Sequence, residues 1–182
     1  MEFKFDVPGV SYLTIDNMKA TFRGVEYLIQ KGHKKILHIG LDPLVKEFNE
    51  REQGYQKVMA KHKCGYSKVI RGDYEMIHNI ELGESIEQII KDDEITAIFC
   101  ANDLVAIGIR EGLRNIGMAD QIDIIGFDGI YKNGYHSLPI TKIATLKQPQ
   151  DEMGKYAINS IIKLIEGDIE DYSKVFECEL LV

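Results

Sequence analysis

Cysteine is scarce in this sequence of 182 residues, and its three copies, Cys64, Cys100 and Cys178, are scattered without CxxC spacing. An odd, dispersed set of thiols argues against a disulfide scaffold and is typical of a reducing compartment. Long apolar runs are also missing, since no stretch approaches the roughly 18 residues that a membrane-spanning helix needs. The first residues, Met1 to Asp6, are charged and lack the apolar core of a signal peptide. The sequence therefore predicts a cytoplasmic protein without a membrane segment.

Basic residues are outnumbered by acidic ones. The sequence has 22 Lys and Arg against 29 Asp and Glu, which gives a net charge of −7. Because phosphate contacts need clustered Lys and Arg, the chain is a poor candidate for direct contact with DNA or RNA. Its one dense basic stretch, Lys31 to Lys35, follows an expected helix, where cations stabilise the negative end of the helix dipole. We interpret that stretch as helix capping around Gly32.

Motifs for catalysis and for cofactor or metal binding are absent from the sequence. There is no GxGxxG loop after a strand, no Walker loop, no GxSxG elbow and no HExxH helix. The five histidines show no metal-ligand spacing, and the acids of segment 80–90 are typical of a solvated helix face. We therefore expect no cofactor, no metal and no enzymatic activity. Side chains distant in sequence can still pair in space, so a doubly wound enzyme stays an open alternative.

Strand-length apolar runs alternate with segments of helical periodicity along the chain. The expected strands are 10–15, 36–39, 68–71, 97–101, 122–127, 140–146 and 175–181, and the expected helices are 17–31, 51–62, 80–90, 104–116 and 151–165. A polar loop is expected over 41–50. This alternation predicts an α/β fold with a doubly wound, mostly parallel sheet and helices on both faces. The last strand alternates apolar and acidic residues, which indicates an edge position.

Polar side chains follow most of the expected strands directly. The clusters are Asp16-Asn17, Asp73-Tyr74, Asn102-Asp103 and Asp128, with Arg51 one loop beyond a further strand. Because the carboxyl ends of parallel strands share one edge of the sheet, we expect these groups to line one cleft. Hydrogen-bond acceptors, donors and one aromatic ring suit a polyhydroxyl ligand.

Each of these residues also has a purely structural explanation. Asn102 is a favourable helix N-cap, and Asp128 can order its own turn. Arg51 can pair with an acid of its own helix, and Tyr74 can belong to the core. The residue pattern alone therefore predicts only a small-molecule-binding α/β domain.

Five short motifs occur in a fixed order along the chain. They are Asp16-Asn17 followed by GHKKI (32–36), RxxGY (51–55), AIFCANDLVAIG (97–108), GFD (126–128), and ATLKQP (144–149) followed by Met153-Gly154. Their order and spacing resemble the LacI/GalR family of bacterial transcriptional regulators through nearly the whole chain.

The resemblance implies a periplasmic-binding-protein-like fold, in which a ligand lies between two lobes. By this resemblance, residues 10–139 and 170–182 form the C-terminal lobe, and 140–167 is a segment of the N-terminal lobe. Most of the N-terminal lobe and the helix-turn-helix DNA-binding domain are then absent from this chain. The resemblance also implies a homodimer that contacts operator DNA only through that missing domain.

Six residues match ligand-binding positions of the family. Arg51, Asn102 and Asp128 match effector-contacting positions, Tyr74 matches a stacking aromatic, and Asp16 and Gln148 match positions facing the cleft. Two departures concern the cleft rim and so the identity of the ligand. The run at 138–143 is longer than in the family, and Gly129 replaces the usual acid.

The predicted function is the effector-sensing part of a LacI/GalR-type regulator. It would bind a sugar or a similar polyhydroxyl metabolite between the lobes and thereby modulate operator binding. The alternative is a solute-binding protein of a transport system, which shares the fold. The GHKKI run favours the regulator.

Overall fold

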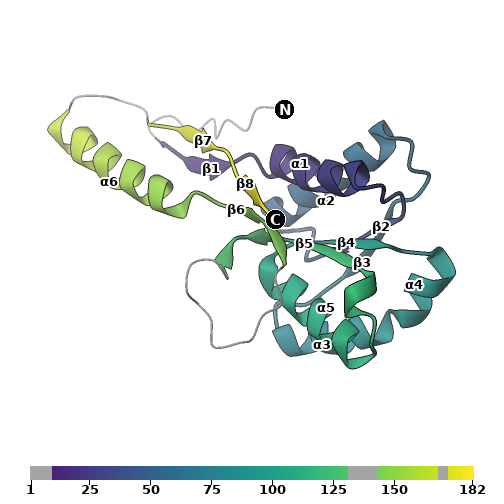
Figure 1. Cartoon of the computed structure of the whole chain (residues 1–182). Coiled ribbons are helices and arrows are strands. Elements are labelled where there is room, and N and C mark those ends of the chain that lie inside the picture. The colour runs from purple at the N-terminus through teal and green to yellow at the C-terminus, as the bar shows by residue number, and fades with distance from the viewer. Residues whose placement is uncertain (1–9, 131–142, 168–171) are drawn as a thin grey trace.

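The structure is a computed structural model that describes residues 10–130, 143–167 and 172–182 (Figure 1). Its main layer is a six-stranded sheet in the order β3-β2-β4-β5-β6-β8, parallel throughout except for the β6–β8 pair. The strands are β2 (Ile36–Gly40), β3 (Lys68–Arg71), β4 (Ala97–Cys100), β5 (Asp123–Asp128), β6 (Ala144–Lys147) and β8 (Glu179–Leu181). The doubly wound, mostly parallel sheet expected from the sequence is confirmed.

Helices cover both faces of this sheet (Figure 1). One face carries α1 (Asn17–Gln30) and α2 (Lys46–Lys61); the other carries α3 (Met76–Ser85), α4 (Glu87–Asp93) and α5 (Asp103–Asn115), with the short 3-10 helix η1 (Ala119–Gln121) before β5. Every residue of β2 and β4 is buried, which explains why these strands are continuous apolar runs rather than alternating ones. Within the described ranges, no helix is both long enough and apolar enough to cross a membrane.

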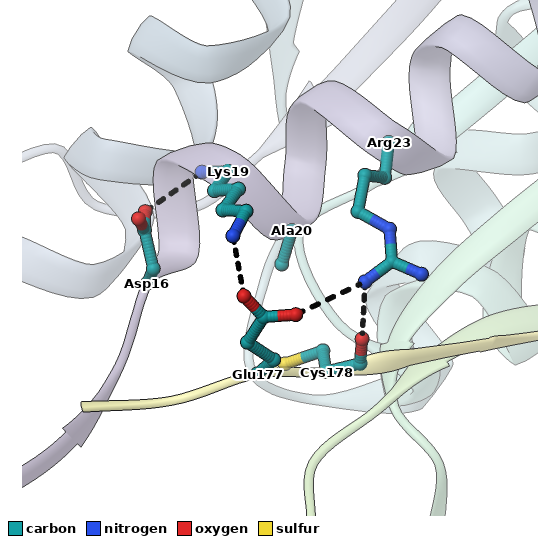
Figure 2. Close-up of a pocket in the computed structure, with 6 residues that line it drawn as sticks. All are labelled: Asp16, Lys19, Ala20, Arg23, Glu177 and Cys178. Carbon is teal, nitrogen blue, oxygen red and sulfur yellow. Dashed lines mark hydrogen bonds and ion pairs between the residues drawn. The ribbon is translucent and has the colours of Figure 1, made fainter. Parts of the chain in front are cut away.

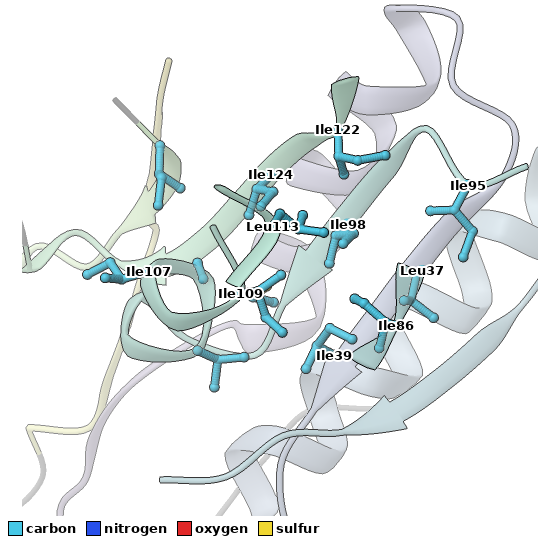
Figure 3. Close-up of a cluster of buried hydrophobic side chains, with 14 of the residues drawn as sticks. Leu37, Ile39, Ile86, Ile95, Ile98, Ile107, Ile109, Leu113, Ile122 and Ile124 are labelled. Atoms are coloured by element: carbon cyan, nitrogen blue, oxygen red, sulfur yellow. The ribbon is translucent and has the colours of Figure 1, made fainter. Parts of the chain in front are cut away.

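Two hydrophobic clusters hold the layers together. The cluster under α5 includes Leu37, Ile39, Ile98 and Ile109, none of which is exposed (Figure 3). The opposite cluster, under α1 and α2, is built on large side chains: Leu28, Tyr55, Phe99 and Phe127. Burial of each such side chain stabilises the fold by about 1.5–3 kcal/mol. The two clusters make the central strands a rigid base for the residues at their carboxyl ends.

A second, smaller layer lies beside the main sheet. Strand β1 (Leu13–Ile15) pairs in parallel with β7 (Lys174–Phe176), and these two strands form a separate sheet. Helix α6 (Gln150–Glu166) lies next to them and extends away from the main sheet (Figure 1). The Tyr156 ring packs edge-on against Phe176, with ring centroids 5.7 Å apart. Five apolar side chains of α6 are exposed: Ile158, Ile161, Ile162, Leu164 and Ile165.

The boundaries of several elements differ from those expected. Helix α2 begins at Lys46, so the polar loop expected over 41–50 was too long. The first turn of α2 carries Lys46, Glu47 and Asn49 outside the core, and these residues show no apolar period. The helix expected over 80–90 is two helices, α3 and α4, separated at the buried Ile86.

The strand expected over 175–181 is also divided. Its first part is β7, which pairs with β1, and its second part is β8, which lies at the edge of the main sheet beside β6. The edge position is confirmed, whereas the single continuous strand is wrong. Strand β6, assigned by resemblance to the other lobe, is hydrogen bonded within the main sheet between β5 and β8. The division into lobes stays a prediction.

Candidate functional site

The carboxyl ends of the central strands bring three of the predicted site residues together. Asn102 follows β4 and is the N-cap of α5, and Asp128 is the last residue of β5. Arg51 lies in the second turn of α2 and reaches across to the same edge. Its Nη1 lies 3.5 Å from Oδ1 of Asp128 and donates to the carbonyl of Ala101, the residue before Asn102. The shared edge predicted from the sequence therefore holds for these three residues.

Arg51 is almost enclosed, with 5% of its side chain exposed. Its Nε donates to Oδ1 of Asn17 at 3.0 Å, so the guanidinium does not pair with an acid of its own helix as the structural interpretation supposed. Asn17 in turn donates through Nδ2 to Oε2 of Glu50 at 3.0 Å. Burial lowers the pKa of Arg51 and raises the pKa of Glu50. Asn17 and Glu50 thus orient Arg51, a role that was not predicted for them.

Aromatic rings flank the Arg51 guanidinium. Its Cζ lies 3.6 Å from the centroid of the Phe127 ring and 5.6 Å from that of Phe48. The Phe48 ring is 5.9 Å from that of Tyr74, which is 55% exposed. The core interpretation of Tyr74 is therefore wrong, and its ring extends an aromatic surface outward from Arg51. Phe48 was missed because it falls in the expected loop, although it lies three residues before Arg51, at the spacing of helix neighbours.

Asn102 has a structural role that the sequence suggested. Its Oδ1 accepts the Val105 N–H at 2.9 Å, which is the N-cap bond of α5. Among the described residues, no group pairs with its Nδ2, and that atom is not fully buried. The N-cap bond therefore uses the Oδ1 atom of Asn102, and its Nδ2 donor can still bind a ligand.

Asp128 has an unusual backbone conformation, with a φ of 110°. Such a conformation costs a residue other than glycine about 1–3 kcal/mol and persists only where the surroundings fix it. Its Oδ1 accepts from Nε2 of Gln148 at 2.7 Å, so Gln148 orients Asp128. Burial raises the pKa of Asp128, and the nearby Arg51 opposes that rise. Its Oδ2 has no partner among the described residues.

Asp103 is a buried carboxylate beside this site that was grouped with Asn102 at a strand end but was not among the six residues matched to ligand-binding positions. It is 1% exposed and accepts from the Thr145 hydroxyl at 2.6 Å and from the Ile130 N–H at 2.9 Å. Burial raises its pKa to about 7. A signal was present in the sequence: Gly126 interrupts a buried strand, which often marks a close approach by another group. A Cβ at Gly126 would lie 2.2 Å from Oδ1 of Asp103.

Asp16 follows a strand outside the main sheet and directly precedes Asn17, whose side chain accepts from Arg51. Strand β1 belongs to the small sheet, so the rule that placed Asp16 with the other strand ends does not apply to it. Its side chain accepts the Lys19 N–H at 2.8 Å as the N-cap of α1. Figure 2 shows it in a small pocket between α1 and the β7–β8 connection, lined by Asp16, Lys19, Ala20, Arg23, Glu177 and Cys178.

Three polar atoms of this arrangement have no hydrogen-bond partner within the described part of the chain. Among the described residues, Nη2 of Arg51, Nδ2 of Asn102 and Oδ2 of Asp128 lack hydrogen-bond partners, and none of the three is fully buried. Two donors and one acceptor next to an aromatic surface can bind a small molecule with several hydroxyl groups. In the part of the chain that the structure describes, no cluster of His, Cys, Asp and Glu could hold a metal ion. The departure at 138–143 lies largely outside the described residues.

Comparison with known proteins gives a consistent family. A family profile described as a periplasmic binding protein-like domain matches residues 25–182. The transcriptional repressor CytR of Escherichia coli K12 is 32% identical over 180 residues, which cover 92% of this chain and 49% of the repressor. The transcriptional regulator MalR of Clostridium butyricum is 29% identical over 182 residues, covering 94% of this chain and 51% of the regulator. The chain thus spans about half the length of these relatives.

Solved structures agree with this assignment. A LacI-family regulatory protein from Chloroflexus aggregans has a TM-score of 0.80 and 25% identity, and the match covers 100% of this chain and 64% of that one. The regulator CelR in complex with cellobiose has a TM-score of 0.78 and 24% identity, covering 98% of this chain and 55% of that one. The second likeness shows the fold alone.

Proposed function

Because this chain belongs to the periplasmic-binding-protein-like family, in its LacI/GalR branch, we propose that it is the effector-sensing part of a transcriptional regulator. Its effector is a small polar metabolite, a sugar or a similar polyhydroxyl compound, bound over Arg51, Asn102 and Asp128. Binding would shift a regulator between two global states with different operator affinity. DNA contact would come from a helix-turn-helix domain outside this sequence. The regulator would act as a homodimer in the cytoplasm.

The observation that carries the proposal is that each of the three site residues binds the protein through at least one polar atom and keeps another polar atom without a partner among the described residues. Arg51 offers Nη2, Asn102 offers Nδ2 and Asp128 offers Oδ2 at one sheet edge. Vicinal hydroxyls both donate and accept, so they match an acidic acceptor beside two donors. The exposed Tyr74 ring can lie against the apolar face of a sugar or a nucleoside. Gln148 supports the site by holding Asp128, and Asp16 lies beside Asn17, which binds Arg51.

Calorimetry with a panel of sugars and nucleosides tests the proposal. We expect at least one compound to bind, and we expect Asn102→Ala and Asp128→Ala each to weaken that binding by about 1–3 kcal/mol, because a polar partner is lost from a buried contact. No binding by any compound of the panel would contradict the proposal. Wild-type affinity in both variants would show that Asn102 and Asp128 serve only as cap and turn residues.

Asn102→Asp separates binding from folding. Aspartate is as good an N-cap as asparagine, so the Val105 N–H keeps its acceptor and the melting temperature should stay near the wild-type value. The free donor of Nδ2 is lost, however. We therefore expect Asn102→Asp to weaken effector binding without the loss of stability that Asn102→Ala causes.

A solute-binding protein of a transport system is the second candidate. It is favoured by the fold, which the matched family profile describes as periplasmic binding protein-like. The coding sequence upstream of this segment distinguishes the two. A helix-turn-helix there would eliminate the transport reading, whereas a signal peptide would eliminate the regulator.

A further inference from the structure

Two consecutive residues after the core of β5 have backbone angles that side chains rarely adopt. The φ of Asp128 is 110° and that of Gly129 is 77°. Glycine adopts such angles freely, but aspartate keeps them only when its surroundings impose them. A side chain at position 129 would also collide with Lys147, since a Cβ there would lie 2.6 Å from its Cγ. The turn that presents Asp128 is therefore strained and needs a constraint.

Asp103 lies beneath this turn and supplies that constraint. Its Oδ2 accepts the Ile130 N–H at 2.9 Å, and its Oδ1 accepts the Thr145 hydroxyl at 2.6 Å. The same hydroxyl oxygen accepts the Gly129 N–H at 3.2 Å. Both amides after Asp128 are thus fixed by one carboxylate, directly or through Thr145. With Asp103 and Thr145 1% and 0% exposed, water does not compete for these bonds.

The fold makes room for Asp103 at a cost. A buried carboxylate is unfavourable in a core that apolar side chains could fill, and burial raises the pKa of Asp103 to about 7. Strand β5 also has a glycine, Gly126, next to this carboxylate, and a Cβ there would lie 2.2 Å from Oδ1 of Asp103. These features indicate that the carboxylate serves the turn rather than the packing of the sheet.

We propose that Asp103, acting through Thr145, is a positioning residue that holds Asp128 in its strained conformation, with Oδ2 left without a partner among the described residues. This inference rests on the proposed function, since an Asp128 that binds no effector has no need of a fixed direction. The direction of the Asp128 side chain would then depend on strand β6, because Thr145 is a residue of that strand.

Amide hydrogen exchange in the folded protein tests the inference. Thr145→Val keeps the side-chain shape but removes the hydroxyl, and Thr145→Ser is the matched control that restores it. In the valine variant we expect exchange to be about tenfold faster or more at Gly129 and at Gln148, because a buried amide has lost its acceptor or its fixed partner. The Gln148 N–H donates to the Asp128 carbonyl at 3.3 Å and so reports on that residue. Ala101, whose N–H donates to Ile39 in the sheet, should keep its wild-type rate in both variants.

Two results would overturn the positioning role. One is wild-type exchange at Gly129 and Gln148 in a folded Thr145→Val protein. The other is an equal acceleration at Ala101, which would mark a loss of global stability only. Should the valine variant not fold, Asp103→Asn is read in the same way, since asparagine keeps the shape but not both acceptors. If exchange at Gly129 and Gln148 accelerates as expected while Asp128→Ala leaves effector affinity unchanged, the proposed function fails, but the positioning of Asp128 by Asp103 and Thr145 still holds.

Discussion

Replacement of Arg51 by methionine tests how the site residues are built into the fold. Methionine keeps an unbranched apolar side chain that can still pack on the Phe127 ring, 3.6 Å from the guanidinium carbon. It removes the donors to Oδ1 of Asn17 and to the Ala101 carbonyl, both of which are buried contacts. The substitution therefore removes charge and hydrogen bonds while largely preserving volume.

The magnitude follows from the partners left behind. Each buried acceptor that loses its donor costs about 1–3 kcal/mol, and relief of the desolvation of the guanidinium offsets part of this. We expect a net loss of about 2–4 kcal/mol in the free energy of unfolding of Arg51→Met. For a domain of this size, each kcal/mol lowers the melting temperature by about 2–4 °C, so a fall of roughly 5–15 °C is expected.

Arg23→Met is the matched control for thermal and urea unfolding. The Arg23 side chain is 47% exposed, donates to the Cys178 carbonyl at 3.1 Å and lies 3.9 Å from Glu177 (Figure 2). Such exposed contacts contribute about 1 kcal/mol or less. Because Arg51 opposes the rise in the pKa of Asp128, that pKa should also move further upward in Arg51→Met, as measured by carbon NMR of the carboxyl group. Equal losses of stability in the two variants, or an unchanged Asp128 pKa, would refute the reasoning.

Four further substitutions have outcomes that follow from the structure. Gly112→Ala should lower the melting temperature, because its Cβ would lie 2.2 Å from the Ile80 carbonyl where α5 crosses α3, whereas Gly154→Ala in α6 meets no atom within 4 Å and should stabilise the protein by about 0.5–1 kcal/mol. Burial raises the folded-state pKa of Asp103 to about 7, above its value in the unfolded chain. Its contribution to the free energy of unfolding is therefore largest below about pH 4 and is lost as the pH rises through about 7. Urea unfolding should show this decline for the wild type and not for Asp103→Asn. Ile165→Glu should leave unfolding within about 0.5 kcal/mol of wild type, because Ile165 is 80% exposed, and a larger loss would mean that α6 packs differently.

The alternation of strands and helices was readable from the sequence because both periods are local. Every strand of the main sheet except the separate β8 was expected near its observed position, and the carboxyl-end rule correctly grouped Arg51, Asn102 and Asp128 at one edge. That rule holds only for strands of one sheet. It therefore does not apply to Asp16, whose strand pairs with β7 instead, and no local pattern marks this pairing across about 160 residues of chain.

The contacts inside the site were not readable for a different reason. Asp103 meets Thr145 across 42 residues and Arg51 meets Asn17 across 34, so neither contact leaves a spacing signal. Polar residues in a first helical turn also look like loop, which hid Phe48 in the expected loop before α2. What the sequence did carry was an indirect sign, a glycine in the middle of a buried strand at position 126.

The structural and functional interpretations of the site residues need not compete. Asn102 uses Oδ1 to cap α5 and leaves Nδ2 outward, and Arg51 uses Nε and Nη1 inward and leaves Nη2 outward. Asp128 divides its two carboxylate oxygens in the same way, with Oδ1 bound to Gln148. In each case the inward atom fixes the direction of the outward one, which is how a rigid edge can present polar groups without the entropy cost of ordering them on binding. Truncation to alanine removes both atoms at once, so only substitutions that keep the inward bond, such as Asn102→Asp, can measure what the outward atom contributes.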